Sequence, residues 1–234
     1  MKFKISLRTI KGLKYIKTFH GHDAFILSQE SFTERYSNFY KNCVHFDTVN
    51  SKYLKARLIE VGISSYKIKV IPIGIDTNFF KGSPKKLPEK TNIELITVER
   101  LVQLKGPEFA LKAIKILSDQ GLNMRYTVIG DGALKEYLIA LTSKLGLNNK
   151  VRFMGACSQE KIKSYLDSSH IFLMPSTYDN ISKRCEAFGL VSLEAQAMGL
   201  PVIGFDSGSF PETIINEKTG FIVRDRSSKE LAEK

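Results

Sequence analysis

From residue 93 onward, the alternation of apolar and polar positions predicts a regular series of strands and helices. Short apolar runs predict six strands, at 93–98, 124–129, 151–154, 170–173, 201–205 and 219–223. Apolar residues at helical spacing predict five helices between them, at 106–119, 133–145, 159–168, 189–198 and 209–216. Strands that alternate with helices of about ten residues are typical of βαβ units around a parallel sheet. We therefore expect an α/β fold.

The pattern before residue 93 is less regular and predicts a smaller unit. The expected elements are strands at 13–19, 44–46 and 67–72, a helix at 51–61, and a helix or loop at 29–41. Ser51 can cap the helix and Gly62 can end it. Residues 81–92 are polar and contain two prolines, which is typical of a linker. We expect two domains, residues 1–77 and residues 78–234.

The stretch 186–205 predicts a loop, a helix that begins at Gly189, a turn and a buried strand. The first amides of such a helix have no intrahelical partner, and the helix dipole favours an anion beside them. Glu186 lies just before the helix and Glu194 lies in its second turn. One carboxylate can face the helix start while the other faces a polar ligand. Both could instead be ordinary exposed acids, since carboxylates are mostly exposed.

Three loops follow predicted strands and therefore lie at the same edge of the sheet, where open parallel sheets bind ligands. The loop 99–106 places Arg100 and Lys105 just before a helix, an arrangement that suits a phosphate. The loops 130–132 and 175–186 join it at that edge. Each signal is weak alone, but together they indicate one anion site beside Gly189.

Composition places the chain among ordinary globular proteins, with 43% hydrophobic and 25% charged residues in 234. No apolar run approaches the ~18 residues of a membrane span, and the basic N-terminus lacks the apolar segment of a signal peptide. The cysteines Cys43, Cys157 and Cys185 are widely spaced, which argues against a disulfide framework and a zinc site. A cytoplasmic setting is therefore predicted.

The net charge of +11 is concentrated at the front of the chain. Residues 1–90 hold 17 Lys and Arg against 7 Asp and Glu, whereas residues 91–234 hold 18 against 17. Such asymmetry suggests an anionic partner: a phosphorylated ligand, an acidic membrane face or a nucleic acid. A merely soluble surface is the alternative. We expect no nucleic-acid partner, because basic and aromatic residues are not interleaved as in a single-strand groove.

Several sequence blocks, taken in order, resemble the glycosyltransferase family 4 group of retaining, nucleotide-sugar-dependent enzymes. The blocks are residues 70–76, 98–106, 128–132 and 151–155, the Glu-x7-Glu element from Glu186 to Glu194, and residues 199–203. The resemblance covers nearly all of residues 15–225. It implies a GT-B architecture: one nearly complete Rossmann-like donor domain with a parallel sheet, preceded by a partial N-terminal Rossmann-like domain on the acceptor side.

The resemblance also implies a role for each matching residue. Glu186 and His20 face the transferred sugar and are the implied catalytic residues, and Glu194 binds the ribose hydroxyls. The donor diphosphate is bound by Arg100, Lys105 and the helix start at Gly189, Leu190 and Val191. Cations and amides can stabilise the departing diphosphate, so no metal or cofactor is expected besides the nucleotide-sugar donor. His20 could instead be a structural loop residue, or form a metal site with His22 and Asp23 that nothing nearby completes.

The implied function is the transfer of a sugar from a nucleotide-diphosphate sugar to a glycan or lipid-linked acceptor, with retention of anomeric configuration, in polysaccharide biosynthesis. The basic front half would meet the anionic inner face of the membrane or a lipid pyrophosphate. Two features depart from the family pattern. Glu99 replaces a usual glycine and could repel the diphosphate. The chain also lacks the start of the first domain and the last helices, so the resemblance implies truncation at both ends. The alternative is a non-catalytic nucleotide-sugar-binding fragment or half of a split enzyme.

Overall fold

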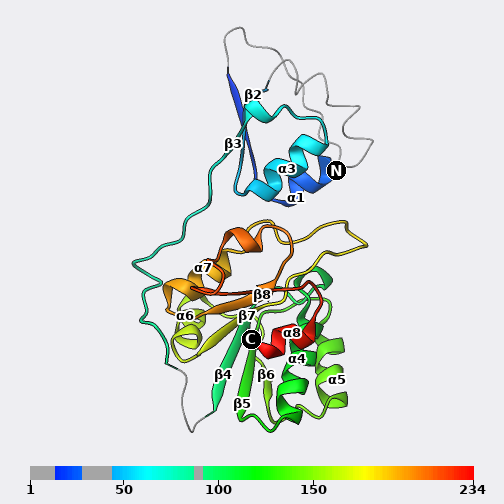
Figure 1. Cartoon of the computed structure of the whole chain (residues 1–234), viewed down its shortest axis with the longest axis vertical. Helices are drawn as coiled ribbons and strands as arrows, with labels where there is room; N and C mark the ends of the chain where they lie inside the picture. The colour runs from blue at the N-terminus through cyan, green and yellow to red at the C-terminus, as the bar shows by residue number, and fades with distance from the viewer. Residues whose placement is uncertain (1–13, 28–43, 87–91) are drawn as a thin grey trace. The chain divides into compact units, whose positions relative to one another are not determined.

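The computed structural model describes residues 14–27, 44–86 and 92–234 (Figure 1). The chain divides into two compact units, Met1–Pro72 and Ile73–Lys234. Within the described residues, no helix combines the length and the apolar composition that crossing a membrane requires.

The first unit holds a parallel three-stranded sheet in the order β1-β2-β3. Its elements are β1 (Tyr15–Phe19), α1 (His22–Leu27), β2 (Val44–Val49), α3 (Lys52–Glu60), the 3-10 turn η1 (Ser65–Lys67) and β3 (Ile68–Val70). The three strands and the helix α3 confirm the sequence prediction, and the Ser51 side chain accepts the amide of Leu54 at 3.1 Å. The interval 29–41 lies outside the described residues.

The short helix α1 is not anticipated by the sequence pattern. The carboxylate of Asp23 explains its start, because Oδ1 accepts the amides of His20, Gly21 and Ala24 at 2.9 to 3.1 Å. The amides of His20 and Gly21 precede the helix, and the amide of Ala24 also donates to the Gly21 carbonyl at 2.9 Å.

The second unit holds a parallel six-stranded sheet in the order β6-β5-β4-β7-β8-β9. The strands are β4 (Ile93–Val98), β5 (Met124–Ile129), β6 (Val151–Phe153), β7 (Ile171–Met174), β8 (Val202–Phe205) and β9 (Gly220–Val223). The helices are α4 (Pro107–Asp119), α5 (Lys135–Lys144), α6 (Gln159–Asp167), α7 (Leu190–Ala197) and α8 (Ser228–Glu233). All six strands and the first four helices confirm the sequence prediction.

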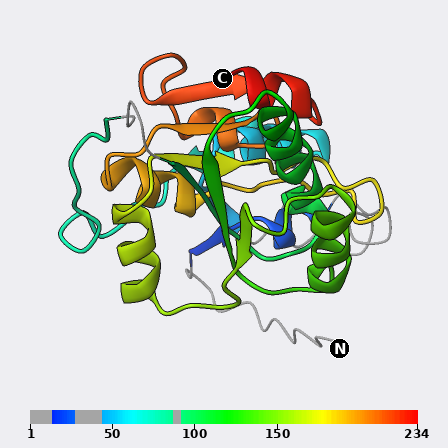
Figure 2. The ribbon, with the colours of Figure 1, turned by 90° about the horizontal axis from the view of Figure 1, so that it is seen from below.

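Two layers of helices cover this sheet, with α4 and α5 on one face and α6 on the other (Figure 2). Each face has its own cluster of buried apolar side chains, which explains why the strands are apolar almost throughout. The strand order reverses between β4 and β7, which are neighbours in the sheet. Ligands of open α/β sheets bind beyond the carboxyl ends of the strands at such a reversal.

The predicted helix at 209–216 is wrong, since only the 3-10 turn η3 (Phe210–Glu212) forms there. Side chains form hydrogen bonds with the backbone carbonyls and amides that would pair with each other in a helix. The Gln196 side chain donates to the Thr213 carbonyl at 2.8 Å, and the Ile215 amide donates to Thr219 Oγ1 at 2.9 Å.

The predicted linker at 81–92 is also wrong for its first part, which docks onto the second unit. The amides of Gly82 and Lys85 donate to the carbonyls of Ala197 and Gly199 at 2.9 and 3.2 Å, beside the end of α7. The physical reason is that carbonyls at a helix end need donors from outside the helix. Residues 87–91 lie outside the described residues.

A buried carboxylate in β2 gives the first unit a testable pH dependence. Asp47 is 1% exposed, and neither carboxylate oxygen has a hydrogen-bond partner. Burial raises the pKa of Asp47 to about 6, while Lys17 and Lys67 pull it the other way. An unfolded aspartate has a pKa of about 3.9, so the protonated side chain stabilises the fold at low pH, and this contribution is lost as pH rises toward 6.

We expect Asp47→Asn to stabilise the first unit at pH 7 by about 1–2 kcal/mol and to flatten its stability between pH 4 and 6. Hydrogen exchange of the β2 amides would measure this, with the exposed Asp119→Asn in the second unit as the control. An unchanged pH profile in Asp47→Asn would contradict the assignment.

Candidate functional site

Two loops meet at the carboxyl ends of β4 and β7. The loop after β4 ends in the 3-10 turn η2 (Gln103–Lys105), and the loop after β7 begins at Pro175. The amide of Thr177 donates to the carbonyl of Leu104 at 2.9 Å. Gly106 has a positive φ of 61°, and a Cβ on it would lie 2.1 Å from the Pro175 carbonyl oxygen. Glycine at 106 therefore allows the two loops to touch.

Lys105 and Glu186 form a largely buried ion pair between these loops. Lys105 Nζ donates to Glu186 Oε2, and the two side chains are only 13% and 11% exposed. Ser176 Oγ donates to the same oxygen at 3.2 Å. Burial alone would raise the pKa of the Glu186 carboxyl, but Lys105, Ser176 and the Phe188 amide lower it below its ordinary value. Glu186 is therefore a carboxylate at neutral pH.

The start of α7 borders this ion pair. Gly189, at φ 82°, is the residue before the helix, and a Cβ on it would lie 2.4 Å from Met174 Cε and 3.5 Å from Glu186 Cγ. Neither Leu190 nor Val191 donates its amide in a hydrogen bond within the described part of the chain. The structure thus brings Lys105, Glu186 and the helix start together, with the two amides unpaired.

Residues that the sequence reasoning missed hold the Glu186 backbone in place. The amide and the hydroxyl of Ser209 both donate to the Glu186 carbonyl at 3.1 Å. A Cβ on Gly208 would lie 2.3 Å from the same oxygen. The signal that could have found them is the Ser-Gly-Ser run at 207–209, since it begins two residues after a predicted strand at the ligand-binding edge.

Two predicted site residues of the second unit, Arg100 and Glu194, form no hydrogen bond with Lys105 or Glu186. The Arg100 side chain is exposed, and it makes no hydrogen bond or ion pair with the described residues. Glu194 is half-buried in α7, and burial raises the pKa of its carboxyl. The described residues offer this carboxylate no hydrogen bond either. Both side chains are therefore available to a ligand, but their predicted roles stay predictions.

His20 lies in the first unit, directly after β1, and its side chain is exposed. Its role toward a sugar stays a prediction. In the alternative metal site, the Asp23 carboxylate accepts three backbone amides, and the side chain of His22 lies outside the described residues. Among the residues described, no three His, Cys, Asp or Glu side chains gather in a way that could hold a metal ion.

Glu99 directly follows β4, and its side chain is partly buried. Its Oε1 atom is inaccessible to solvent and has no hydrogen-bond partner. Burial raises the pKa of Glu99 well above its ordinary value, the ammonium of Lys105 lowers it, and the carboxylate of Glu186 raises it further. The neutral form of this carboxyl group is therefore favoured more than in an ordinary glutamate, which weakens the charge that could repel a diphosphate.

Taken together, the geometry suits an anionic ligand. A buried ammonium, two unpaired amides and the positive end of a helix dipole lie at the reversal point of a parallel sheet. The exposed guanidinium of Arg100 follows β4 at the same edge.

Comparison with known proteins gives one family and several relatives. The family model described as "Glycosyl transferases group 1" matches residues 79–234. The putative colanic acid biosynthesis glycosyltransferase WcaL of Escherichia coli K12 is 29% identical over 231 residues, covering 97% of this chain and 55% of that protein. The amylovoran biosynthesis glycosyltransferase AmsK of Erwinia amylovora is 30% identical, with the same coverage. The chain thus spans about half the length of these relatives.

Solved structures agree with the fold. HepE of Anabaena in complex with UDP has a TM-score of 0.79 at 23% identity, over 93% of this chain and 60% of that one. A glycosyltransferase from Rickettsia africae has a TM-score of 0.77 at 25% identity, over 93% and 58%. The predicted α/β fold with parallel sheets of the GT-B type is confirmed.

Proposed function

Because the chain belongs to the glycosyl transferases group 1 family, we propose that its second unit binds a nucleotide-diphosphate sugar as a glycosyl donor. The sugar passes to a glycan or lipid-linked acceptor in polysaccharide biosynthesis. Two relatives are named for the biosynthesis of colanic acid and amylovoran, which supports this acceptor class. HepE has been crystallised in complex with UDP-glucose, which supports the donor class. Membership of family 4 and retention of configuration belong to the same proposal, supported by the motif resemblance.

The observation that carries the proposal is the buried Lys105–Glu186 pair beside the unpaired amides of α7. Breaking the bond between the anomeric carbon and the diphosphate leaves negative charge on the leaving group. Preorganised cations and amides stabilise such developing charge. In the proposed donor complex, Lys105, Arg100 and the amides near Gly189 contact the diphosphate.

The acids complete the proposed donor complex at its two ends. Glu186 remains ionised, so it can accept hydrogen bonds from the sugar or stabilise positive charge at the anomeric carbon. Glu194 accepts hydrogen bonds from the ribose. His20 contributes a sugar contact from the first unit. The acceptor oxygen attacks on the face that the diphosphate leaves, and its proton passes to the leaving phosphate.

Neither a metal ion nor a further cofactor enters this proposal, because the cations and amides already supply the charge stabilisation. We place the reaction in the cytoplasm at the inner face of the membrane. The excess of Lys and Arg in residues 1–90 supports this placement, because it would favour an anionic lipid surface or a lipid pyrophosphate acceptor.

Arg100→Ala tests the site without disturbing the fold, since the side chain is exposed and unpaired in the described structure. We expect UDP or GDP to bind about tenfold more weakly, the loss expected for one charge-assisted contact to phosphate, with unchanged stability. Isothermal titration calorimetry would measure both ligands.

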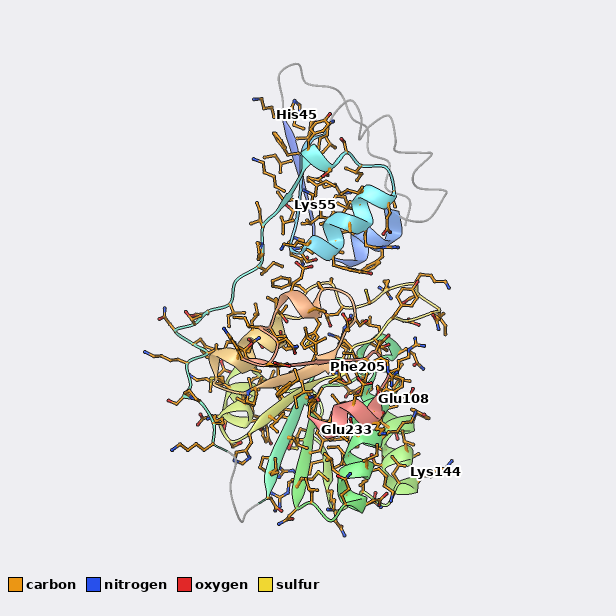
Figure 3. All side chains as sticks on the ribbon, viewed as in Figure 1. His45, Lys55, Glu108, Lys144, Phe205 and Glu233 are labelled. Carbon is orange, nitrogen blue, oxygen red and sulfur yellow. The ribbon has the colours of Figure 1, made fainter. Side chains whose placement is uncertain are left out.

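Lys144→Ala is the matched control for Arg100→Ala. It removes one exposed positive charge from the last turn of α5, where the side chain points outward (Figure 3). Equal affinities of Arg100→Ala and Lys144→Ala for UDP and GDP would show that Arg100 does not contact the nucleotide. Failure of the wild-type chain to bind either nucleotide would reject the proposal.

The alternative function is nucleotide-sugar binding without transfer, or half of a split enzyme. Incubating the chain with UDP-glucose or GDP-mannose and measuring release of the nucleoside diphosphate separates the two. Binding without release favours the alternative.

A further inference from the structure

Arg226 joins the turn after the edge strand β9 to the loop after β7. Its guanidinium donates from Nε to Thr177 Oγ1 at 3.1 Å and from a terminal nitrogen to the Tyr178 carbonyl. A guanidinium presents its N–H groups in a rigid planar fork, so two such bonds fix both the position and the orientation of what they contact. The proposed mechanism does not use this residue.

The turn that carries Arg226 is fixed by contacts of its own. The Ser227 side chain accepts the amide of Glu230 at 3.2 Å, at the start of α8. Ser228 Oγ donates to the carbonyl of Phe109 at 2.9 Å, which ties the start of α8 to α4 beside it (Figure 1). Arg226 is therefore anchored to a helix layer of the sheet, independently of the loop that it contacts.

The backbone of Arg226 is unusual for a residue with a side chain. Its φ is 61°, and it is the third residue of a turn in which the Ser227 amide donates to the Arg224 carbonyl at 3.1 Å. Glycine is the usual residue at a turn position with positive φ, because any side chain there strains the backbone. Strain of this kind persists where the surroundings stabilise it, and it clusters at functional sites. Arginine at this position forms two hydrogen bonds to the loop that glycine could not form.

The loop residues that Arg226 contacts lie next to those that build the site. The amide of Thr177 donates at 2.9 Å to the carbonyl of the residue before Lys105. Ser176, which precedes Thr177, donates its hydroxyl to Glu186 Oε2 at 3.2 Å. Thr177 is only 4% exposed, so its hydroxyl needs a partner within the protein, and Arg226 provides one. Arg226 is thus linked through two adjacent loop residues to both members of the ion pair.

We propose that Arg226 is a positioning residue for the donor site: it holds the loop after β7 in the place where Lys105 meets Glu186. This inference rests on the proposed function, because it assumes that the ion pair and the start of α7 bind a nucleoside diphosphate. Arg226 acts through Thr177 and Tyr178 and does not contact the ligand itself.

Arg226→Gly tests this role, because it removes the guanidinium and also relieves the strained backbone. We expect the affinity for UDP and GDP in calorimetry to fall about tenfold, the order of loss caused by a small displacement of binding groups. Hydrogen exchange of the Thr177 amide should become about tenfold faster, because local opening of the loop is no longer restrained. Exchange in β4 and β5 should not change. A general loss of stability would instead speed exchange in these core strands as well.

Two further variants separate positioning from direct contact with the ligand. Arg226→Lys keeps the positive charge but lacks the planar fork, so the affinity should stay low. Thr177→Val removes the hydroxyl and keeps the loop amide. Arg226→Gly should therefore weaken binding less in the Thr177→Val background than in wild type. Wild-type affinity in Arg226→Lys, or fully additive losses in the double variant, would overturn the inference.

Arg224→Ala is the matched control. This arginine lies in the same turn, its side chain is 76% exposed, and it pairs with Glu230 at 2.9 Å. Its removal takes away one positive charge without touching the loop, so nucleotide affinity and Thr177 exchange should match wild type.

The remaining outcomes distinguish this inference from the proposed function. If Arg226→Gly fails to fold, Arg226→Asn gives the same comparison, because asparagine tolerates a positive φ. Unchanged affinity and unchanged Thr177 exchange in these variants overturn the inference and leave the proposed function standing. Faster Thr177 exchange in the variants, with no nucleotide binding by the wild-type chain, supports the positioning of the loop and rejects the proposed function.

Discussion

Lys105→Ala is expected to weaken the binding of UDP or GDP about 100-fold and to destabilise the second unit by about 3 kcal/mol. The first effect follows from removing the buried cation that would contact the diphosphate. The second follows because Glu186, with an 11% exposed side chain, would lose its ion-pair partner and remain a buried carboxyl group. Guanidinium unfolding followed by circular dichroism measures the stability, and calorimetry measures the affinity.

The double variant Lys105→Met/Glu186→Gln separates these two effects. It replaces the buried ion pair by uncharged groups of similar size, so most of the stability should return. The affinity should not return, because the ammonium is still missing. Lys144→Ala again serves as the control for loss of a surface charge. Recovery of nucleotide binding in the double variant would show that Lys105 supports the fold and does not bind the ligand.

Gly106→Ala is expected to destabilise the second unit by about 3 kcal/mol or more. A residue at φ 61° with a Cβ is strained by about 1–2 kcal/mol, and this Cβ would also lie 2.1 Å from the Pro175 carbonyl oxygen. Relieving that overlap moves the loops after β4 and β7 apart and separates Lys105 from Glu186. Nucleotide binding should therefore fall together with stability.

Gly146→Ala provides a matched control for Gly106→Ala. Gly146 has a similar φ of 70°, but a Cβ there meets no atom within 4 Å. Gly146→Ala should lower the free energy of unfolding only by the strain of the left-handed backbone, about 1–2 kcal/mol. Nucleotide binding should be unchanged. Equal losses in the two variants would mean that the contact with Pro175 does not hold the loops in register.

The alternation of strands and helices after residue 93 was predictable because each parallel strand is buried on both faces and each helix on one. The same periodicity failed at 209–216, where side chains from elsewhere take the backbone hydrogen bonds, and at 82–85, where the chain docks on α7. Both failures come from partners distant in the sequence, which a local pattern does not contain.

The sequence by itself determined the α/β fold, the sheet edge where the loops gather, and the residue types at that edge. Local hydrophobic spacing and the positions of glycines are sufficient for this, because they act over a few residues. Only the tertiary structure decided that Lys105 pairs with Glu186, 81 positions away, that Ser209 holds the Glu186 backbone, and that Oε1 of Glu99 is inaccessible to solvent without a hydrogen-bond partner. These facts depend on which loops the strand order brings together and on how much water the packed site excludes, and neither is encoded in any short stretch of the chain.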